Sequence, residues 1–409
     1  MTITDSEAPP ATFGSRAFKA DPFPFYAALR VTQPVSRVVL PDRQRAWLVT
    51  RYADVAACLK DARLAKDRRN AMTPQQIAKQ PWVPAFVRPL ERNMLDLDDP
   101  DHARLRALVH KAFTPATVER LRGRIQVIAD QLIDRMVSTH PRDLIAAYAL
   151  PLPLAVIVEL LGVPGRDRAR FHRWSRAIVR PPTPLNMARA IPALLAFMRY
   201  LRGLVRRLRD DPQEGLLTAL VQVEEAGDRL SEDELLAMAF LLLIAGHETT
   251  VNLIASGMFA LLQHPDQMEQ LRADPSLIKP AIEELLRYTN PLETATERYA
   301  REDLAIADTA IPRGVLVLAV LASANRDEAQ FPNADALDLS RAENRHLAFG
   351  LGSHFCLGAP LARLEGQIAI NTLLRRLPTL RLGAAADTLR WRATPTLRGL
   401  EALPVRYYK

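Results

Sequence analysis

A long apolar segment with helix signals at both ends sets the strongest limit on how this chain can fold. Residues 231–265 read SEDELLAMAFLLLIAGHETTVNLIASGMFALLQHP. Ser231 and Glu234 have the spacing of a capping box, which marks a helix start, and Pro265 marks the end. At 1.5 Å per residue, such a helix is roughly 45–50 Å long. The sequence therefore predicts a buried helix that crosses the whole domain.

The composition fits a soluble protein with a sizeable core. The chain has 409 residues, of which 48% are hydrophobic and 24% are charged. The N-terminus has no apolar run, and the most apolar stretch, 235–246, is too short to span a membrane. The two cysteines, Cys58 and Cys356, cannot form a disulfide framework, which favours a reducing compartment. We therefore expect a cytoplasmic protein without membrane contact, with one domain over 1–409 and a flexible N-terminus over 1–20.

The net charge of +8 allows two interpretations. The excess of basic residues forms a solvated surface, or it forms a docking face for an acidic partner. No basic tract is interleaved with aromatic residues, so the sequence gives no support for nucleic-acid binding.

Periodicity divides the chain into a helical part, a β-rich part and a coil. Most of residues 20–290 shows helical spacing of apolar residues. Between 291 and 325, short β-leaning runs surround a turn at Pro312. Residues 325–356 show little periodicity, and a coil that long inside a compact domain usually has a functional reason. Because a helix resumes after Gly358, the predicted fold class is mainly α with small β-sheets (α+β).

The coil ends in FGLGSHFCLG, residues 349–358, where glycines surround a single cysteine. A lone cysteine is most often a small buried hydrophobe, and Cys356 allows that interpretation. Gly350, Gly352 and Gly358 also suit a tight loop that closely approaches a flat partner. The helix after Gly358 favours a thiolate through its dipole and its free N–H groups. Zinc would need further Cys or His ligands at close spacing, whereas haem needs one axial ligand, and a thiolate there favours O–O cleavage.

This loop resembles the cysteine signature of the cytochrome P450 superfamily, with Phe349, His354, Cys356 and Gly358 at its fixed positions. The resemblance extends over nearly the whole chain. It implies that Cys356 is the iron ligand of a haem b lying between the long central helix and the cysteine loop. It also implies that O2 is a co-substrate. Among soluble bacterial members, the chain is most similar to actinobacterial hydroxylases that tailor macrolides and other polyketides.

A second family motif is the E-x-x-R sequence formed by Glu284 and Arg287. On its own, an i,i+3 ion pair on a helix surface is common and only weakly stabilising. The resemblance implies that this pair is buried and that Arg341, in the coil, completes a network of charged hydrogen bonds. Its role would be structural, because it holds the loop that holds the haem.

The segment AGHETT, residues 245–250, places polar groups midway along the apolar helix. The segment is either a satisfied polar patch in the core or an oxygen-binding groove. Under the second interpretation, the resemblance implies that the small Ala245 and Gly246 let dioxygen lie against a locally distorted helix. It further implies that Thr249 assists oxygen activation and that Glu248 relays protons from solvent.

Four residues match the cations that hold the haem propionates in the family, although each alone would be an ordinary surface or capping charge. His102 and Arg106 lie one helical turn apart, Arg298 lies in the β-rich part, and His354 lies two residues before the cysteine. By resemblance, they bind the two carboxylates, which need such partners in a largely buried pocket.

The positions that line the substrate pocket by resemblance are mostly apolar or small, which suits a hydrophobic substrate. They lie in the loop 70–95, in the region 171–195, and at Leu241, Ile244, Ala245, Leu292, Glu293, Thr294, Thr396 and Leu397. Two interpretations stand for Glu293. It faces the pocket and pairs with an amino-sugar cation or a hydroxyl, or it is a solvated or backbone-bonded carboxylate.

The main functional hypothesis is a monooxygenase that hydroxylates a bulky apolar secondary metabolite of the macrolide or polyketide type. As a monomer, it would take two electrons from a ferredoxin and its reductase, and an acidic ferredoxin suits the positive charge. Steroids, vitamin D-like compounds and fatty acids are alternative substrates. A fatty-acid peroxygenase would use the substrate carboxylate in place of Thr249 and Glu248, and a haem-based gas sensor would need neither residue.

Overall fold

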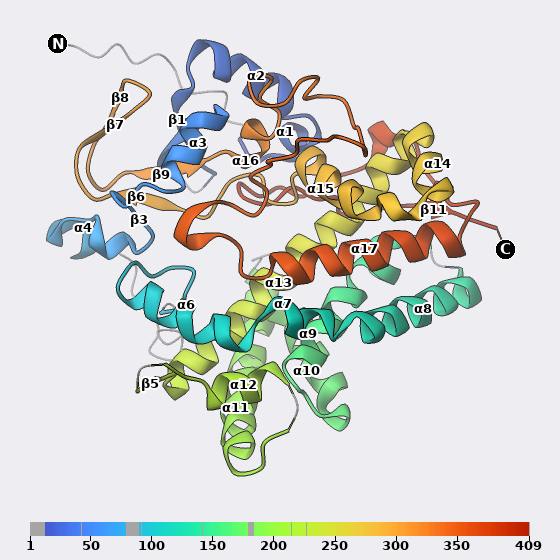
Figure 1. Cartoon of the computed structure of the whole chain (residues 1–409). Coiled ribbons are helices and arrows are strands. Elements are labelled where there is room, and N and C mark those ends of the chain that lie inside the picture. The colour runs from blue at the N-terminus through green and yellow to red at the C-terminus, as the bar shows by residue number, and fades with distance from the viewer. Residues whose placement is uncertain are drawn as a thin grey trace.

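The computed structural model describes residues 13–41, 43–78, 90, 92–140, 142–178, 184–213, 215–225 and 227–408. Helices dominate these residues, and α13 (Glu232–Gln263) runs through their centre (Figure 1). At its start, the Glu234 N–H donates to the Ser231 hydroxyl and the Ser231 N–H donates to the Glu234 carboxylate. The predicted capping box and long helix are therefore confirmed.

Hydrophobicity alone would let α13 span a membrane, but its surroundings are those of a core helix. Among the described residues, it is the one helix with the length and composition of a membrane span. Most of its apolar window is buried against other parts of the protein. Protein thus covers much of α13, which explains why the helix is apolar over most of its length.

Further helices precede and follow α13 along the chain. Before it come α1 (Arg16–Ala20), α2 (Phe23–Thr32), α3 (Tyr52–Cys58), η1 (Arg68–Asn70), α4 (Pro74–Ala78), α6 (Asp101–Ala112), α7 (Pro115–Glu119), α8 (Arg122–Thr139), η2 (Ile145–Ala149), α9 (Pro151–Leu160), η3 (Gly165–Asp167), α10 (Arg168–Ile178), α11 (Pro184–Asp210) and α12 (Leu216–Gln222). After it come α14 (Pro265–Ala273), η4 (Pro275–Leu277), α15 (Ile278–Thr289), α16 (Leu321–Ala324), η5 (Gly352–His354), α17 (Ala359–Arg376) and η6 (Ala386–Thr388).

The strands form small sheets, as the α+β prediction requires. The largest sheet has the order β1-β2-β9-β6-β3, in which only the β2–β9 pair is parallel. Its strands are β1 (Val35–Val39), β2 (Arg45–Val49), β3 (Leu64–Ala65), β6 (Arg298–Ala300) and β9 (Leu316–Ala319). The two-stranded pairs are β4 (Glu224–Glu225) with β5 (Asp228–Arg229), β7 (Leu304–Ile306) with β8 (Thr309–Ile311), and β10 (Arg381–Leu382) with β11 (Val405–Arg406).

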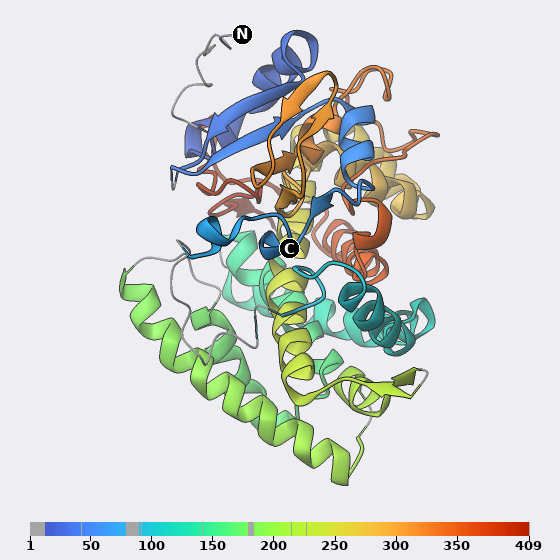
Figure 2. The same cartoon turned by 90° about the vertical axis from the view of Figure 1, so that its left-hand side faces the viewer.

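The β-rich part and the helical part lie at opposite ends of the molecule. Figure 2 shows the large sheet with α1 to α3 at one end, the helices α10 to α12 at the other, and α13 running between them. Since β2 comes from the N-terminal part of the chain and β9 from the C-terminal part, the sheet joins both ends of the sequence in one fold.

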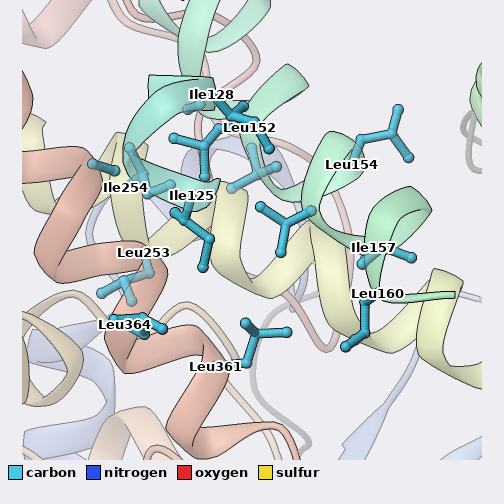
Figure 3. Close-up of a cluster of buried hydrophobic side chains, with 14 of the residues drawn as sticks. Ile125, Ile128, Leu152, Leu154, Ile157, Leu160, Leu253, Ile254, Leu361 and Leu364 are labelled. Carbon is cyan, nitrogen blue, oxygen red and sulfur yellow. The ribbon is translucent and has the colours of Figure 1, made fainter. Parts of the chain in front are cut away.

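The largest hydrophobic core lies where α8, α9, α13 and α17 meet. Figure 3 draws apolar side chains of this core and labels Ile125, Ile128, Leu152, Leu154, Ile157, Leu160, Leu253, Ile254, Leu361 and Leu364. The predicted apolar face of the helix after Gly358 is confirmed, because Leu361, Leu364 and Ile368 are all buried. This packing fixes α17, and with it the cysteine loop, against the central helix.

Two segments outside the regular elements bear on the site. The coil 325–356 contains neither α-helix nor strand, as predicted, and its one helical turn is η5. At the N-terminus, the expectation of flexibility through residue 20 is wrong from residue 13 onward, because α1 is folded and its Lys19 is fully buried. Residues 1–12 lie outside the described part of the chain.

Candidate functional site

The cysteine loop is a tight turn that requires glycine at one point. The Cys356 N–H donates to the Phe349 carbonyl at 2.9 Å and closes the loop. Gly352 has a φ of +78°, and a Cβ there would lie 2.8 Å from the Leu59 carbonyl oxygen at the end of α3. A side chain at this position would therefore meet both backbone strain and a backbone clash.

The Cys356 sulfur lies beside the N-terminus of α17, whose N-cap is Gly358. Burial raises the pKa of the Cys356 thiol, while the N–H groups of Gly358 and Ala359 and the charges of Arg106 and Arg363 oppose that shift. The N–H groups and cations around the sulfur therefore offset part of the effect of burial and support a thiolate ligand. Within the described ranges, no cluster of three or more His, Cys, Asp and Glu side chains could hold a metal ion by itself.

A buried ion-pair network attaches the coil to α15. Glu284 and Arg287 are both fully buried, and Arg287 donates twice to the Glu284 carboxylate at 2.7 and 2.8 Å. Arg341 donates to the same carboxylate at 3.1 Å. Arg287 also donates to three backbone carbonyls of the coil, which are those of Asn325, Ala334 and Ala336. The structure thus brings together the three residues that the sequence singled out and connects them to the segment that carries Cys356.

A second anchor of the loop was not foreseen from the sequence. Glu283, next to Glu284 on α15, accepts two hydrogen bonds of 2.8 Å from Arg363 of α17. Its carboxylate also lies 3.1 Å from the His346 Nε2. The Arg363 guanidinium in turn lies 4.5 Å from the centre of the Phe349 ring. Glu283 therefore joins both sides of the cysteine loop to α15.

Replacing Glu283 with Gln should change how stability depends on pH. Burial alone would raise the pKa of Glu283, but the bonds from His346 and Arg363 bring it to about 2, below the ordinary value of 4.5. A carboxyl with a lowered pKa stabilises the fold above its unfolded pKa, and that contribution disappears as the pH falls toward 2. Glu283→Gln should thus cost about 3 kcal/mol at pH 7 and progressively less below pH 4.5.

Urea unfolding at several pH values measures this difference. Glu302→Gln, which alters an exposed carboxylate, is the control. A cost for Glu283→Gln that is the same at pH 7 and pH 3 would contradict the prediction.

Four ionisable side chains from separate elements form a buried basic cluster. The rings of His102 and His354 stack with centroids 3.9 Å apart. Burial lowers the pKa of His354 to about 3, and the nearby positive charges of His102, Lys66 and Arg298 add to that shift. Three of these residues were predicted as a group, and Lys66 is an additional member that no sequence motif indicated.

The basic cluster fits the two carboxylates of a haem. Two of its cations have neutral partners, since Lys66 donates to the Thr296 hydroxyl and the Glu297 carbonyl and Arg298 donates to the Thr296 carbonyl. Burial lowers the pKa of Lys66 to about 7 and that of Arg298 to about 10. The His102 Nε2 is buried without a hydrogen-bond partner. Buried cations and an unpaired ring nitrogen are the groups that two propionates would satisfy.

Arg106, the fourth predicted cation, forms a hydrogen bond with the cysteine loop. Its guanidinium donates to the Phe355 carbonyl at 2.8 Å, directly before Cys356. Burial lowers the pKa of Arg106, and the neighbouring Cys356 opposes that shift. Arg106 therefore contributes positive charge beside the sulfur as well as a hydrogen bond to its loop.

The middle of α13 is open on one side. Ala245 and Gly246 are exposed although Leu243 and His247 beside them are buried. The helix is continuous here, so the expected local distortion does not interrupt α13. Instead, the hydroxyls of Thr249 and Thr250 donate to the carbonyls four residues earlier, at 2.9 and 3.0 Å. Such back-bonding satisfies both hydroxyls within the apolar helix.

Glu248 lies next to Thr249 and has a cationic neighbour. Its carboxylate is 3.8 Å from the Arg392 guanidinium, and both side chains are partly exposed. A carboxylate that touches solvent and adjoins Thr249 has the position that a proton relay requires.

The predicted pocket positions divide into two groups. Leu241, Ile244, Leu292, Thr396 and Leu397 are partly exposed. Leu292 and Leu397 also pair in an isolated antiparallel bridge, which brings two distant segments side by side. These five residues, with Ala245, could contact a substrate.

Glu293 and Thr294 form the second group, and both are fully buried. The Glu293 carboxylate accepts from Lys19 at 2.7 Å and from the Tyr26 hydroxyl at 2.5 Å. The structure therefore corrects both interpretations of Glu293, because its partners are side chains of the N-terminal helices. Of the predicted loops, residues 79–89 and 91 and residues 179–183 lie outside the described part of the chain.

A thiolate loop, a buried basic cluster and an open face on a central helix together define a haem-thiolate protein. Residues 197–381 match the family model "Cytochrome P450". The chain belongs to the cytochrome P450 family and is a monooxygenase of that family, which uses haem and O2.

Individual relatives cover almost the whole chain. Cytochrome P450 monooxygenase PikC of Streptomyces venezuelae is 48% identical over 95% of this chain and 92% of its own length. Vitamin D(3) 25-hydroxylase of Pseudonocardia autotrophica is 44% identical over 99% of this chain and 98% of its own. The solved structure of Bacillus subtilis PksS, a P450 of the bacillaene polyketide synthase, has a TM-score of 0.89 at 44% identity. It covers 97% of this chain and 99% of that chain.

Proposed function

We propose that this protein hydroxylates a bulky apolar compound of the macrolide or polyketide type. It would do so as a cytoplasmic monomer that holds haem b and receives two electrons from a ferredoxin and its reductase. The observation that carries the proposal is the open face of α13, where Ala245 and Gly246 are exposed beside Thr249 and Glu248. A gas sensor needs no such pair, and a peroxygenase replaces it with the substrate's own carboxylate.

Each part of the site has a separate task in this reaction. Cys356 would hold the haem iron, and His102, Arg298, His354 and Lys66 would hold the propionates. The bound haem supplies oxygen activation and insertion of one oxygen atom into a C–H bond. The protein's own contribution is a thiolate stabilised by N–H groups, a hydroxyl at Thr249 on the open helix face, and a carboxylate at Glu248 that supplies protons.

The substrate class rests on the partly exposed residues and on the relatives. Leu241, Ile244, Leu292 and Leu397 offer an apolar surface, and the hydroxyl of Thr396 adds one polar group. PksS is a polyketide biosynthesis protein by name, which supports the same class. The vitamin D(3) 25-hydroxylase supports a steroid-like alternative, since it matches this chain over nearly its full length.

Surface charge and one exposed ring support the proposed electron donor. The net charge is +8, and an acidic ferredoxin is attracted to such a protein. Phe355, directly before Cys356, is 37% exposed, so the cysteine loop reaches the surface. A partner that docks there comes within a few residues of the iron ligand.

The test of the proposed function uses Thr249→Val and Thr250→Val as a matched pair. The ligand class is first chosen by titrating the ferric holoprotein with macrolides, their aglycones, steroids and fatty acids, and a saturable blue shift of the Soret band is expected with macrolide-type compounds. Thr249→Val should bind that ligand unchanged but lose product formation about a hundredfold, the range for a group that assists proton transfer.

Thr250→Val is the control because its hydroxyl makes the same backbone bond but is buried. It should retain wild-type product formation. Equal losses in both variants, or full activity of Thr249→Val, would contradict the role of Thr249. A Soret shift with steroids alone would replace the polyketide proposal.

A further inference from the structure

Two chain segments that contribute residues to the proposed substrate pocket are held together by backbone hydrogen bonds. The Glu293 N–H donates to the Thr396 carbonyl at 2.7 Å, and the Arg398 N–H donates to the Pro291 carbonyl at 3.1 Å. With the bridge between Leu292 and Leu397, these bonds join segments 291–294 and 396–398 into one unit. We call this unit the paired wall.

The paired wall also touches α13 close to the oxygen site. Asn252 of α13 donates to the Pro291 carbonyl at 3.3 Å, one turn after Thr249. Gly399 packs so closely against Asn252 that a Cβ would lie 2.0 Å from its Oδ1. A shift of the paired wall would therefore change its contacts with α13, the helix that carries Thr249 and Glu248.

On its other side, the paired wall is attached to the N-terminal helices by two buried charges. Glu293 accepts from Lys19 and Tyr26, and both Lys19 and Glu293 are fully buried. From the other segment, the Arg398 guanidinium donates to the carbonyls of Lys19 and Ala20 at 3.2 and 3.3 Å. One charge from each half of the wall is thus bound to α1, and Glu293 is also bound to α2.

These contacts favour one position of the wall more than they stabilise the fold. A buried ion pair gives little net stability compared with apolar residues of the same size, because removing both charges from water is costly. Its geometric demands are strict, however, since Glu293 meets two fixed donors at 2.7 and 2.5 Å. A carboxylate held in this way keeps the backbone of residues 292–294 in a single register.

We propose that Lys19 and Tyr26 are positioning residues for substrate recognition, because they hold Glu293 and so fix the paired wall. The inference rests on the proposed function, since only an oxygenase with a distal pocket gives this wall a ligand to recognise. The N-terminal helices then act on the fit of bulky ligands without touching them. Loosening these contacts should weaken the binding of bulky ligands, because such ligands must then order the wall when they bind. The binding of small ligands should be unaffected.

The test compares two iron-binding probes on the ferric holoprotein. Imidazole is too small to need the pocket walls, whereas 4-phenylimidazole carries a ring that must pack against them. Each is titrated while the Soret band is followed. The variants are Tyr26→Phe, which keeps the ring contacts with Phe18 and Phe25, and the double variant Lys19→Met with Glu293→Gln, which removes both charges of the Lys19–Glu293 ion pair.

The expected result is a rise in the Kd of 4-phenylimidazole, by about tenfold in the double variant and less in Tyr26→Phe, with the Kd of imidazole unchanged. Arg16 lies on the same helix α1 and forms an exposed ion pair with Glu401. Arg16→Gln, which breaks that pair, is the matched control and should change neither Kd. If the double variant fails to bind haem, Tyr26→Phe alone decides the outcome.

Two other outcomes are distinguishable. Equal changes for both probes, no change for either, or the same change in Arg16→Gln would overturn the positioning role. A wild-type protein that shows no Soret shift with imidazole would instead count against the proposed function itself.

Discussion

Cys356→Ser should abolish the thiolate-type absorption spectrum of the holoprotein and lower turnover more than about a hundredfold, since even outer-shell partners of a metal ligand contribute 10–100-fold. A serine hydroxyl stays protonated near neutral pH and cannot replace the thiolate that the N–H groups of Gly358 and Ala359 favour. Absorption spectra of the purified ferric and CO-bound ferrous protein measure the first effect, and product formation measures the second.

The second cysteine provides the control for this experiment. Cys58 is buried in a separate apolar cluster, and burial raises the pKa of its thiol to about 12. Cys58→Ala should keep the thiolate spectrum and lose about 1 kcal/mol of stability through the small cavity. A thiolate spectrum that survives Cys356→Ser, or disappears in Cys58→Ala, would show that Cys356 is not the ligand.

Arg287→Met should destabilise the protein by about 3–5 kcal/mol, because it leaves the buried Glu284 carboxylate without its main partner. The remaining donors are Arg341, Asn344 and the Asp338 N–H, and they lie at the less buried side of the network. The coil also loses three hydrogen bonds from the guanidinium, so haem retention should decrease together with the free energy of unfolding. Urea unfolding and the ratio of haem to protein absorbance measure both effects.

Arg122→Met is the matched control, because Arg122 and Glu119 form an exposed ion pair with the same i,i+3 spacing where α7 ends and α8 begins. Exposed pairs contribute little, so its unfolding midpoint should stay near that of the wild type. Similar losses in the two variants would mean that spacing, and not burial, sets the strength of the Glu284–Arg287 pair.

Prediction from the sequence succeeded where the cause of a structural feature lies close to it in the chain. Local signals predicted α13, because the residues that start and end the helix lie within one turn of its two ends. The cysteine loop was also predictable, because a tight turn needs glycine where φ is positive, as it is at Gly352. The family signature then added Glu284, Arg287 and Arg341, whose contacts span long distances along the chain.

Other parts of the site had no local signal. Lys66 joins the basic cluster from a segment far from His102 and His354 in sequence, and a lone lysine in a loop normally indicates a solvated surface. Glu283 differs from Glu284 only by one position, yet it faces His346 and Arg363 instead of Arg287. Which of two adjacent carboxylates meets which cation depends on how three elements pack.

The sequence by itself determined the elements that local chemistry controls, which are the long capped helix, the aperiodic coil and the tight loop around Cys356. The tertiary structure decided the partners of the buried charges. Lys19 and Glu293 illustrate this division, because they lie 274 residues apart and nothing in either neighbourhood indicates the other. Burial makes their contact compulsory, since a charge removed from water needs a partner, and only the folded chain shows which partner is within reach.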